Sequence, residues 1–168
     1  MRGIVILVLV LVCFGLGSWV ATYEPEPNWY ENESNHFSYT FASPSLYESA
    51  IATAQDIDRT GARSAIVAHH LLVGDKIAQT FAALGNGREK TVVILSPNHF
   101  NRGRSVMQTT DGTWETPFGD VEVDVKVLEE LLDTVEGLGD EPETFEGEHG
   151  VSAIVPFVKQ FFPNAKII

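Results

Sequence analysis

Two short apolar runs, residues 63–68 (RSAIVA) and 91–95 (TVVIL), flank a stretch with helical periodicity at residues 75–84. Neither run alternates apolar with polar side chains. Runs of this kind are typical of strands that are buried on both faces, as in a parallel sheet covered by helices. The strand–helix–strand order therefore predicts an α/β fold, with a mixed or mostly parallel sheet and flanking helices.

Histidines follow both predicted strands. The first run ends directly in His69 and His70, and the second is followed by a short turn that ends in His99. Ligands of open α/β sheets bind at the carboxyl ends of the strands. Histidine is the commonest metal ligand in proteins and a general base suited to neutral pH. The pattern thus indicates a metal or acid–base site, and the alternative is that each histidine is a hydrogen-bonded structural residue.

Two more features bear on this site. Neighbouring side chains of a strand point to opposite faces, so only one of His69 and His70 should face it. His149, between Glu148 and Gly150 just before a predicted helix, could approach the same edge.

The N-terminus carries an apolar run, residues 4–21, with Ser18 as its one plainly polar side chain. As a helix it would be about 27 Å long, close to the thickness of a bilayer's hydrocarbon core. A retained signal anchor, a cleaved signal peptide and a buried core helix are the alternatives, and the run predicts an N-terminal transmembrane helix. Arg2 before the run, with acids after it, predicts a membrane-anchored protein whose remaining domain is extracytoplasmic, or a secreted one if the run is cleaved.

The chain divides into three predicted parts: a signal anchor or signal peptide at residues 1–21, an acidic, proline-containing linker at 22–44, and a folded domain at 45–168. Within the domain, the Asp111-Gly112 dipeptide predicts a hairpin after residues 105–110. Helices are expected near residues 125–134 and 151–158, and a further strand near the C-terminus.

Charge and composition exclude several classes of function. The formal net charge is −12, which repels phosphate backbones and argues against nucleic-acid binding. A single cysteine rules out an internal disulfide and any CxxC motif within this sequence. The sequence has no GxSxG motif and no phosphate-binding glycine loop, so serine hydrolases and nucleotide-binding proteins have little support.

Four short motifs in a fixed order resemble those of the MEMO family, also called AmmeMemoRadiSam system protein B. The family pairs V-P-H and G-P-N-H strand ends with T-P-L-G-x-V-x-V-D, then E-H-S and an L-P-F-L helix. The four matching segments of this chain are 67–69 (VAH), 96–99 (SPNH), 116–124 (TPFGDVEVD) and 148–150 (EHG), and the helix that follows, 154–158 (IVPFV), resembles the family's helix.

That family is similar to the class III extradiol dioxygenases, whose α/β fold holds a non-haem iron. The resemblance implies that His69 and His99 are metal ligands and that His149 is a catalytic acid or base. The implied cofactor is a divalent metal, iron first and copper or zinc as alternatives. The implied function is redox or dioxygenase-like chemistry, and the alternative is a non-catalytic protein that binds a small molecule or a peptide. The other proteins of the AmmeMemoRadiSam system are the implied partners.

The chain departs from the family pattern at several positions. Ala68 replaces the proline before the first histidine, and Gly150 replaces the serine after His149. The family fold continues past the strand where this sequence ends, and its third metal ligand lies in that later region. We therefore expect either a fragment of a longer protein or an incomplete metal site.

Overall fold

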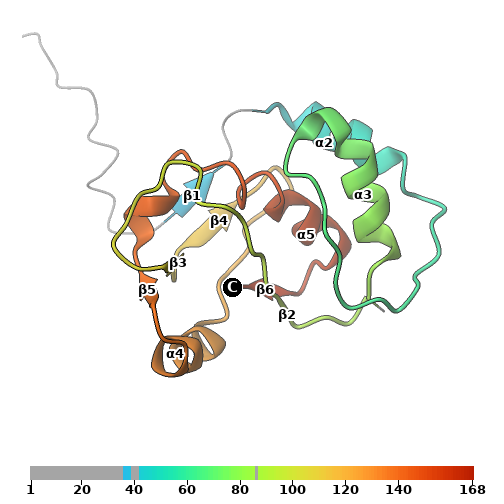
Figure 1. Ribbon diagram of the computed structural model, residues 1–168. Coiled ribbons are helices and arrows are strands. Elements are labelled where there is room, and N and C mark those ends of the chain that lie inside the picture. Colours follow the sequence, from blue (N-terminus) through green and yellow to red (C-terminus); the bar gives the residue numbers. More distant parts are fainter. Residues whose placement is uncertain (1–35, 39–41, 86) are drawn as a thin grey trace, which may run out of the picture. The chain divides into compact units, whose positions relative to one another are not determined.

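The computed structural model describes residues 36–38, 42–85 and 87–168 (Figure 1). Its helices and strands, in chain order, are β1 (His36–Ser38), α2 (Pro44–Ala52), the 3-10 helix η2 (Leu71–Val73), α3 (Gly74–Ala83), β2 (Thr91–Val92), β3 (Met107–Thr109), β4 (Thr113–Glu115), α4 (Val125–Thr134), β5 (Leu138–Asp140), the 3-10 helix η3 (Pro142–Phe145), α5 (Val155–Phe161) and β6 (Lys166–Ile167). This mixture of helices and short parallel strands is consistent with an α/β fold.

The sheet differs from the prediction. In the described part of the chain, the strands form three two-stranded parallel sheets, β1-β4, β2-β6 and β3-β5, and not one continuous sheet. Isolated bridges extend two of them: Val123 pairs with Ile167 of β6, and Val121 pairs with Trp114 of β4.

The two apolar runs are covered on one face only, which corrects the expectation of strands buried on both faces. Val67, Val92 and Ile94 pack against the core. Their neighbours face outward: Ile66 is fully exposed, and Leu95 is 90% exposed. Residues 63–68 belong to no named strand, and residues 91–95 contain only the two-residue β2. A strand buried on both faces needs a layer on each side, and the described residues supply one.

The predicted hairpin is also wrong. β3 pairs in parallel with β5 and β4 pairs in parallel with β1, so the Asp111-Gly112 turn joins strands of two different sheets. Trp114 of β4 is 2% exposed, and its ring meets that of Phe145 edge-on at 5.9 Å. Long-range apolar packing of this kind outweighs a local turn preference.

α3 and α4 follow the sequence pattern closely, whereas α5 begins at Val155, four residues after the start expected near residue 151. α3 buries Ile77 and Phe81, as its periodicity predicts, and α4 spans the expected residues 125–134. Asp124 caps α4, because its side chain accepts a hydrogen bond from the backbone N–H of Val127. Pro156 lies in the first turn of α5, where a missing N–H costs nothing.

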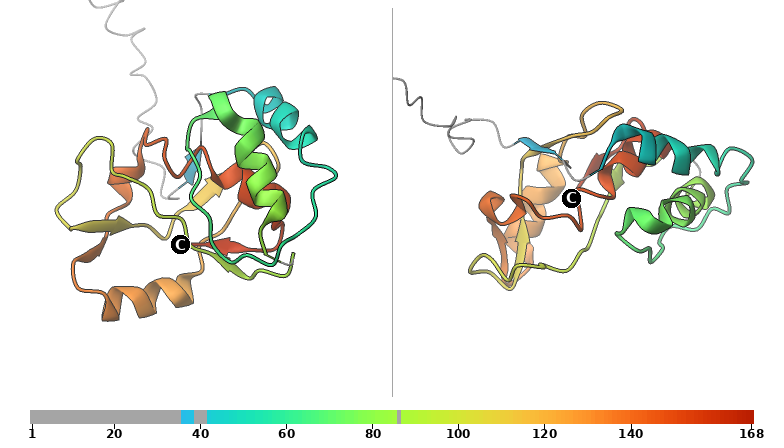
Figure 2. Two further views of the ribbon diagram at one scale, coloured as in Figure 1. Left: turned by 45° about the vertical axis from the view of Figure 1, so that its right-hand side comes forward. Right: turned by 90° about the horizontal axis from the view of Figure 1, so that it is seen from above.

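The core joins α2, α3 and α5, which contact one another in the structure (Figure 2). Phe157 of α5 is fully buried, with its ring centroid 5.4 Å from that of Tyr47 and 6.0 Å from that of Phe81. This aromatic cluster fixes the N-terminal end of α5, and the turn that carries His149 leads directly into that helix.

The predicted transmembrane helix requires a correction. The helices in the described residues are all too short or too polar to cross a bilayer. The apolar run 4–21 and most of the predicted linker 22–44 lie outside the described residues. No helix of the described residues therefore supports the predicted membrane-anchored, extracytoplasmic protein, and that prediction is not retained.

Candidate metal centre

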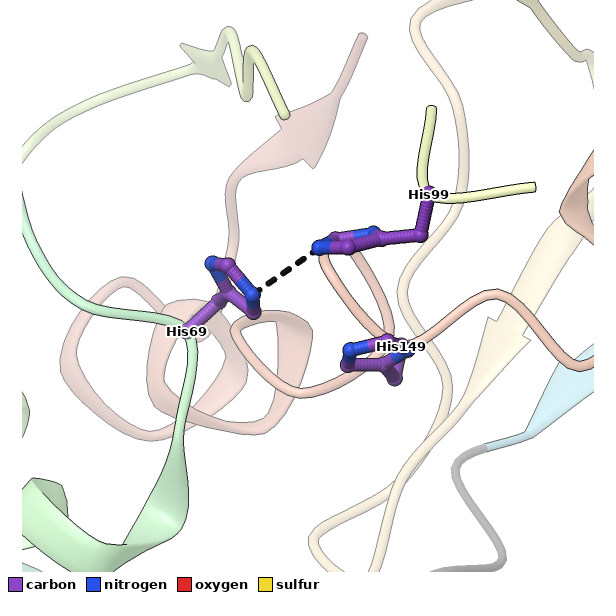
Figure 3. Close-up of side chains that lie close together, drawn as sticks. All are labelled: His69, His99 and His149. Atoms are coloured by element: carbon purple, nitrogen blue, oxygen red, sulfur yellow. Dashed lines mark hydrogen bonds between the residues drawn. The ribbon is translucent and has the colours of Figure 1, made fainter. Parts of the chain in front are cut away.

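Three histidines from distant parts of the sequence meet at one point. His69 precedes η2, His99 lies in the loop after β2, and His149 lies in the turn before α5. The Nε2 atoms of His69 and His99 are 3.0 Å apart. Each of the three residues offers one ring nitrogen, and these nitrogens all lie within 4.8 Å of one another (Figure 3).

The imidazole rings are packed against each other. The ring centroids of His99 and His149 are 4.2 Å apart at an interplanar angle of 30°, and those of His69 and His99 are 4.7 Å apart, edge to face. His70 has its ring 4.9 Å from that of His69, but it is exposed and lies outside the group of three. Of the adjacent pair, His69 is therefore the one that joins the cluster.

A buried carboxylate, that of Glu148, contacts the ring nitrogen of His99 that does not face His69. Oε1 of Glu148 lies 2.5 Å from Nδ1 of His99, and the Glu148 side chain is 5% exposed. Its Oε2 accepts hydrogen bonds from the backbone N–H groups of Gly150 (2.7 Å) and Val151 (3.2 Å). Burial opposes ionisation of Glu148, but these two N–H groups and His99 outweigh it and hold the pKa of the carboxyl below its ordinary value.

His69 is biased toward its neutral form. Burial lowers its pKa below the ordinary value of 6.5, and the neighbouring histidines, His99 first, lower it further. A metal ligand must offer a free lone pair, so a histidine that stays neutral at lower pH suits that role.

The donor set fits a metal ion. Bonds of about 2.0–2.1 Å from imidazole nitrogen to a divalent metal place two ligand nitrogens about 3.0 Å apart at a right angle and about 3.4 Å apart at a tetrahedral angle. The separation of 3.0 Å between the Nε2 atoms of His69 and His99 matches this range. The three-histidine group as a whole extends to 4.8 Å, so the side chains must close in for all three to bind one ion.

Asn98 anchors the loop that presents His99. Its amide nitrogen donates to the carbonyl oxygen of Arg102 (2.6 Å) and to Oε1 of Gln108 (3.2 Å), and its Oδ1 accepts from the backbone N–H of Arg102. Arg102 in turn lies over the ring of Phe100 and donates to the carbonyl oxygen of Glu146. The loop from 98 to 102 is thus tied to the segment that precedes His149.

An apolar cavity of about 370 Å³ adjoins the site. Apolar side chains that follow or belong to β2, β3, β4 and β6 form much of its wall, and Asn98 and Glu148 line it as well. Sequence reasoning did not identify Glu148 as a partner of His99 or find this cavity. A carboxylate next to His149, in a segment leading into an apolar helix, was the available signal for Glu148.

Short strands, flanking helices and three convergent histidines together define an α/β domain with a candidate metal centre. A family model described as "Memo-like protein" matches residues 28–168. The chain therefore belongs to the Memo-like, or MEMO, family, as its motifs indicated.

Individual relatives agree with this assignment. A MEMO1 family protein of Caldivirga maquilingensis is 36% identical over 108 residues, which cover 62% of this chain and 38% of the relative. A MEMO1 family protein of Pyrobaculum arsenaticum is 33% identical over 60% of this chain and 36% of its own length. A MEMO1 family protein of Metallosphaera sedula is 31% identical over 67% of this chain and 42% of its own length. The matched part of this chain spans about two fifths of the length of these relatives.

Proposed function

We propose that this chain binds a divalent metal ion, iron in preference to copper or zinc, through His69 and His99, and that it supports redox or dioxygenase-like chemistry. The observation that carries the proposal is the 3.0 Å separation of the two Nε2 atoms, which suits two ligands of one ion. Imidazole is a good ligand for iron, copper and zinc alike. The preference for iron comes from the family's likeness to the class III extradiol dioxygenases.

The three histidines have different tasks in this proposal. His69 and His99 donate the lone pairs of their Nε2 atoms. His149, whose ring lies 4.2 Å from that of His99, accepts or delivers a proton at a ring nitrogen, as imidazole does near neutral pH. Bound iron would supply redox chemistry and activation of dioxygen. Two histidines leave further coordination positions for solvent, substrate or a ligand from outside the described residues.

The experiment uses the full chain, stripped with a chelator, loaded with Fe(II) without oxygen and then given air-saturated buffer and catechol. We expect His149→Ala to bind iron like the wild type but to consume oxygen much more slowly. His99→Ala should bind little iron and consume oxygen at the background rate of free iron. His70→Ala, which alters an exposed histidine outside the cluster, is the matched control. Equal iron content in the wild type and His99→Ala would refute the assignment.

A second function is favoured by the apolar cavity. A cavity of about 370 Å³ has the size of a small-molecule site, and its walls are mostly apolar. In this alternative the chain binds an apolar ligand or peptide side chain without catalysis. The dye ANS serves as the probe: binding that is unchanged by chelator, and weakened by a Leu95→Glu substitution at an exposed residue that also lines the cavity, would support the binding function. ANS binding that disappears with the metal would count against it.

A further inference from the structure

We propose that Glu148 is a positioning residue that keeps the proton of His99 on Nδ1, so that the bare Nε2 atom faces His69 and the metal position. This inference rests on the proposed metal-binding function and extends it to a residue that is not itself a ligand. It follows from the hydrogen-bond geometry of one buried carboxylate.

The short contact between Glu148 and His99 has one donor, Nδ1 of His99. An ionised carboxylate can only accept hydrogen bonds. Oε1 of Glu148 lies 2.5 Å from Nδ1 of His99, and Oε2 accepts two backbone N–H groups, so the carboxylate is the acceptor on both oxygens and the geometry assigns the proton of this contact to Nδ1. In a neutral imidazole one nitrogen carries the proton and the other carries the lone pair. The lone pair of His99 is therefore on Nε2, the atom that lies 3.0 Å from His69.

His69 is the donor in its contact with His99. In the metal-free chain the contact between the two Nε2 atoms needs one donor and one acceptor. Because Nε2 of His99 accepts, Nε2 of His69 must donate. Metal binding then requires only His69 to move its proton, to Nδ1 or to solvent, whereas His99 is already in the ligating form.

The second carboxylate oxygen of Glu148 binds the turn that follows His149. Oε2 of Glu148 accepts the N–H groups of Gly150 and Val151, which follow His149 in the chain. The hydroxyl of Ser152 also donates to the backbone oxygen of Glu148. One residue thus orients the His99 ring and fixes the turn that presents His149. Outer partners of this kind are known to set the tautomer and orientation of ligating histidines.

Glu148→Gln separates this role from a merely structural one. Glutamine has the same shape, and its amide oxygen can still accept the N–H groups of Gly150 and Val151. Its amide nitrogen, however, would then face Nδ1 of His99 and donate to it. The substitution should therefore preserve the turn but drive the His99 proton to Nε2, where it blocks the metal.

The test combines ring-nitrogen NMR with Zn(II) titration, using the full chain labelled with ¹⁵N-histidine and the redox-inert ion Zn²⁺. Spectra are taken on the metal-free protein at a pH above the range in which histidine titrates. We expect the Nδ1–H form of His99 in the wild type and the Nε2–H form in Glu148→Gln. Zn²⁺ affinity should fall about 10–100-fold in that variant, as is typical when an outer partner is lost. Glu146→Gln, an exposed carboxylate two residues away, should change neither result.

The Zn²⁺ titration tests the metal-binding function, and the NMR spectra test the role of Glu148 independently of it. Absence of Zn²⁺ binding in the wild type would refute the metal-binding function, while the NMR spectra still decide the role of Glu148. An Nε2–H form of His99 in the wild type would overturn the inference directly, without any variant. The same tautomer in the wild type and Glu148→Gln, or equal Zn²⁺ affinities, would also overturn it.

Discussion

Gly150 and Ser96 occupy neighbouring space beside Glu148, the carboxylate that contacts His99. A Cβ atom on Gly150 would lie 3.0 Å from Cβ of Ser96 and would overlap the Ser96 hydroxyl. In the family motifs that this sequence resembles, the pair is reversed: glycine stands in G-P-N-H where this chain has Ser96, and serine stands in E-H-S where it has Gly150. We therefore expect the two departures from the family pattern to compensate each other.

This exchange predicts coupling between the two positions. Gly150→Ser alone should destabilise the protein by about 1–3 kcal/mol, the usual cost of overpacking, because the Ser96 Cβ cannot move without its backbone. Adding Ser96→Gly should restore most of the loss. Chemical denaturation of the four proteins in the double-mutant cycle measures the coupling. Additive effects of the two substitutions would show that the residues do not share this space.

The aromatic core should dominate the stability of the domain. Phe157 is fully buried against Tyr47 and Phe81. Phe157→Ala should therefore lower the free energy of unfolding by about 3–5 kcal/mol, as large-to-small changes of buried aromatic residues do. Phe100→Ala, at a side chain that is 48% exposed, is the matched control and should cost far less. Equal losses for the two variants would contradict the described core.

Asp124 should make part of the stability dependent on pH. The Thr91 hydroxyl donates to its Oδ2 at 2.6 Å and lowers the pKa of the carboxyl from 3.8, with a smaller contribution from the N–H of Val127. The folded state thus binds this proton less readily than the unfolded state. The stabilisation is fully present above pH 3.8 and is lost as the pH falls through the lower folded-state pKa.

Thermal melting between pH 7 and pH 2 tests this dependence. Asp124→Asn can still cap α4 but does not ionise, so its melting temperature should lie below that of the wild type near neutral pH. The difference should shrink as the pH falls below about 3.8. Asp120→Asn, which changes an exposed carboxylate, serves as the control. A difference that stays constant down to pH 2 would exclude a role for the ionised Asp124.

The local features of the fold could be predicted from the sequence. Helical periodicity located α3 and α4 to within a residue. α3 buries an apolar stripe and is followed by Gly85 at positive φ, and α4 begins after the capping residue Asp124. The family motifs singled out His69, His99 and His149, and the structure brings these three together. Their roles as ligands and as acid or base stay predictions.

Long-range features were harder to predict. Apolar runs without alternation suggested strands covered on both faces, yet Ile66 and Leu95 are exposed, because covering a second face requires a layer that the runs themselves do not encode. The Asp111-Gly112 turn favoured a hairpin, but the strand before it pairs in parallel with the later strand β5, and the strand after it pairs in parallel with the earlier strand β1. The bond between His99 and Glu148 joins residues 49 positions apart, and the position of Glu148 beside His149 was its one signal in the sequence.

In the proposed metal centre, His69 and His99 bind one metal ion between them. Calorimetric titration of Zn²⁺ into the chelator-treated full chain measures this binding. We expect one ion per chain, unchanged affinity in His70→Ala, and in His69→Ala and His99→Ala a loss greater than the roughly 10–100-fold typical of an outer partner. Affinities in those two variants equal to that of the wild type would show that the two histidines are not the ligands.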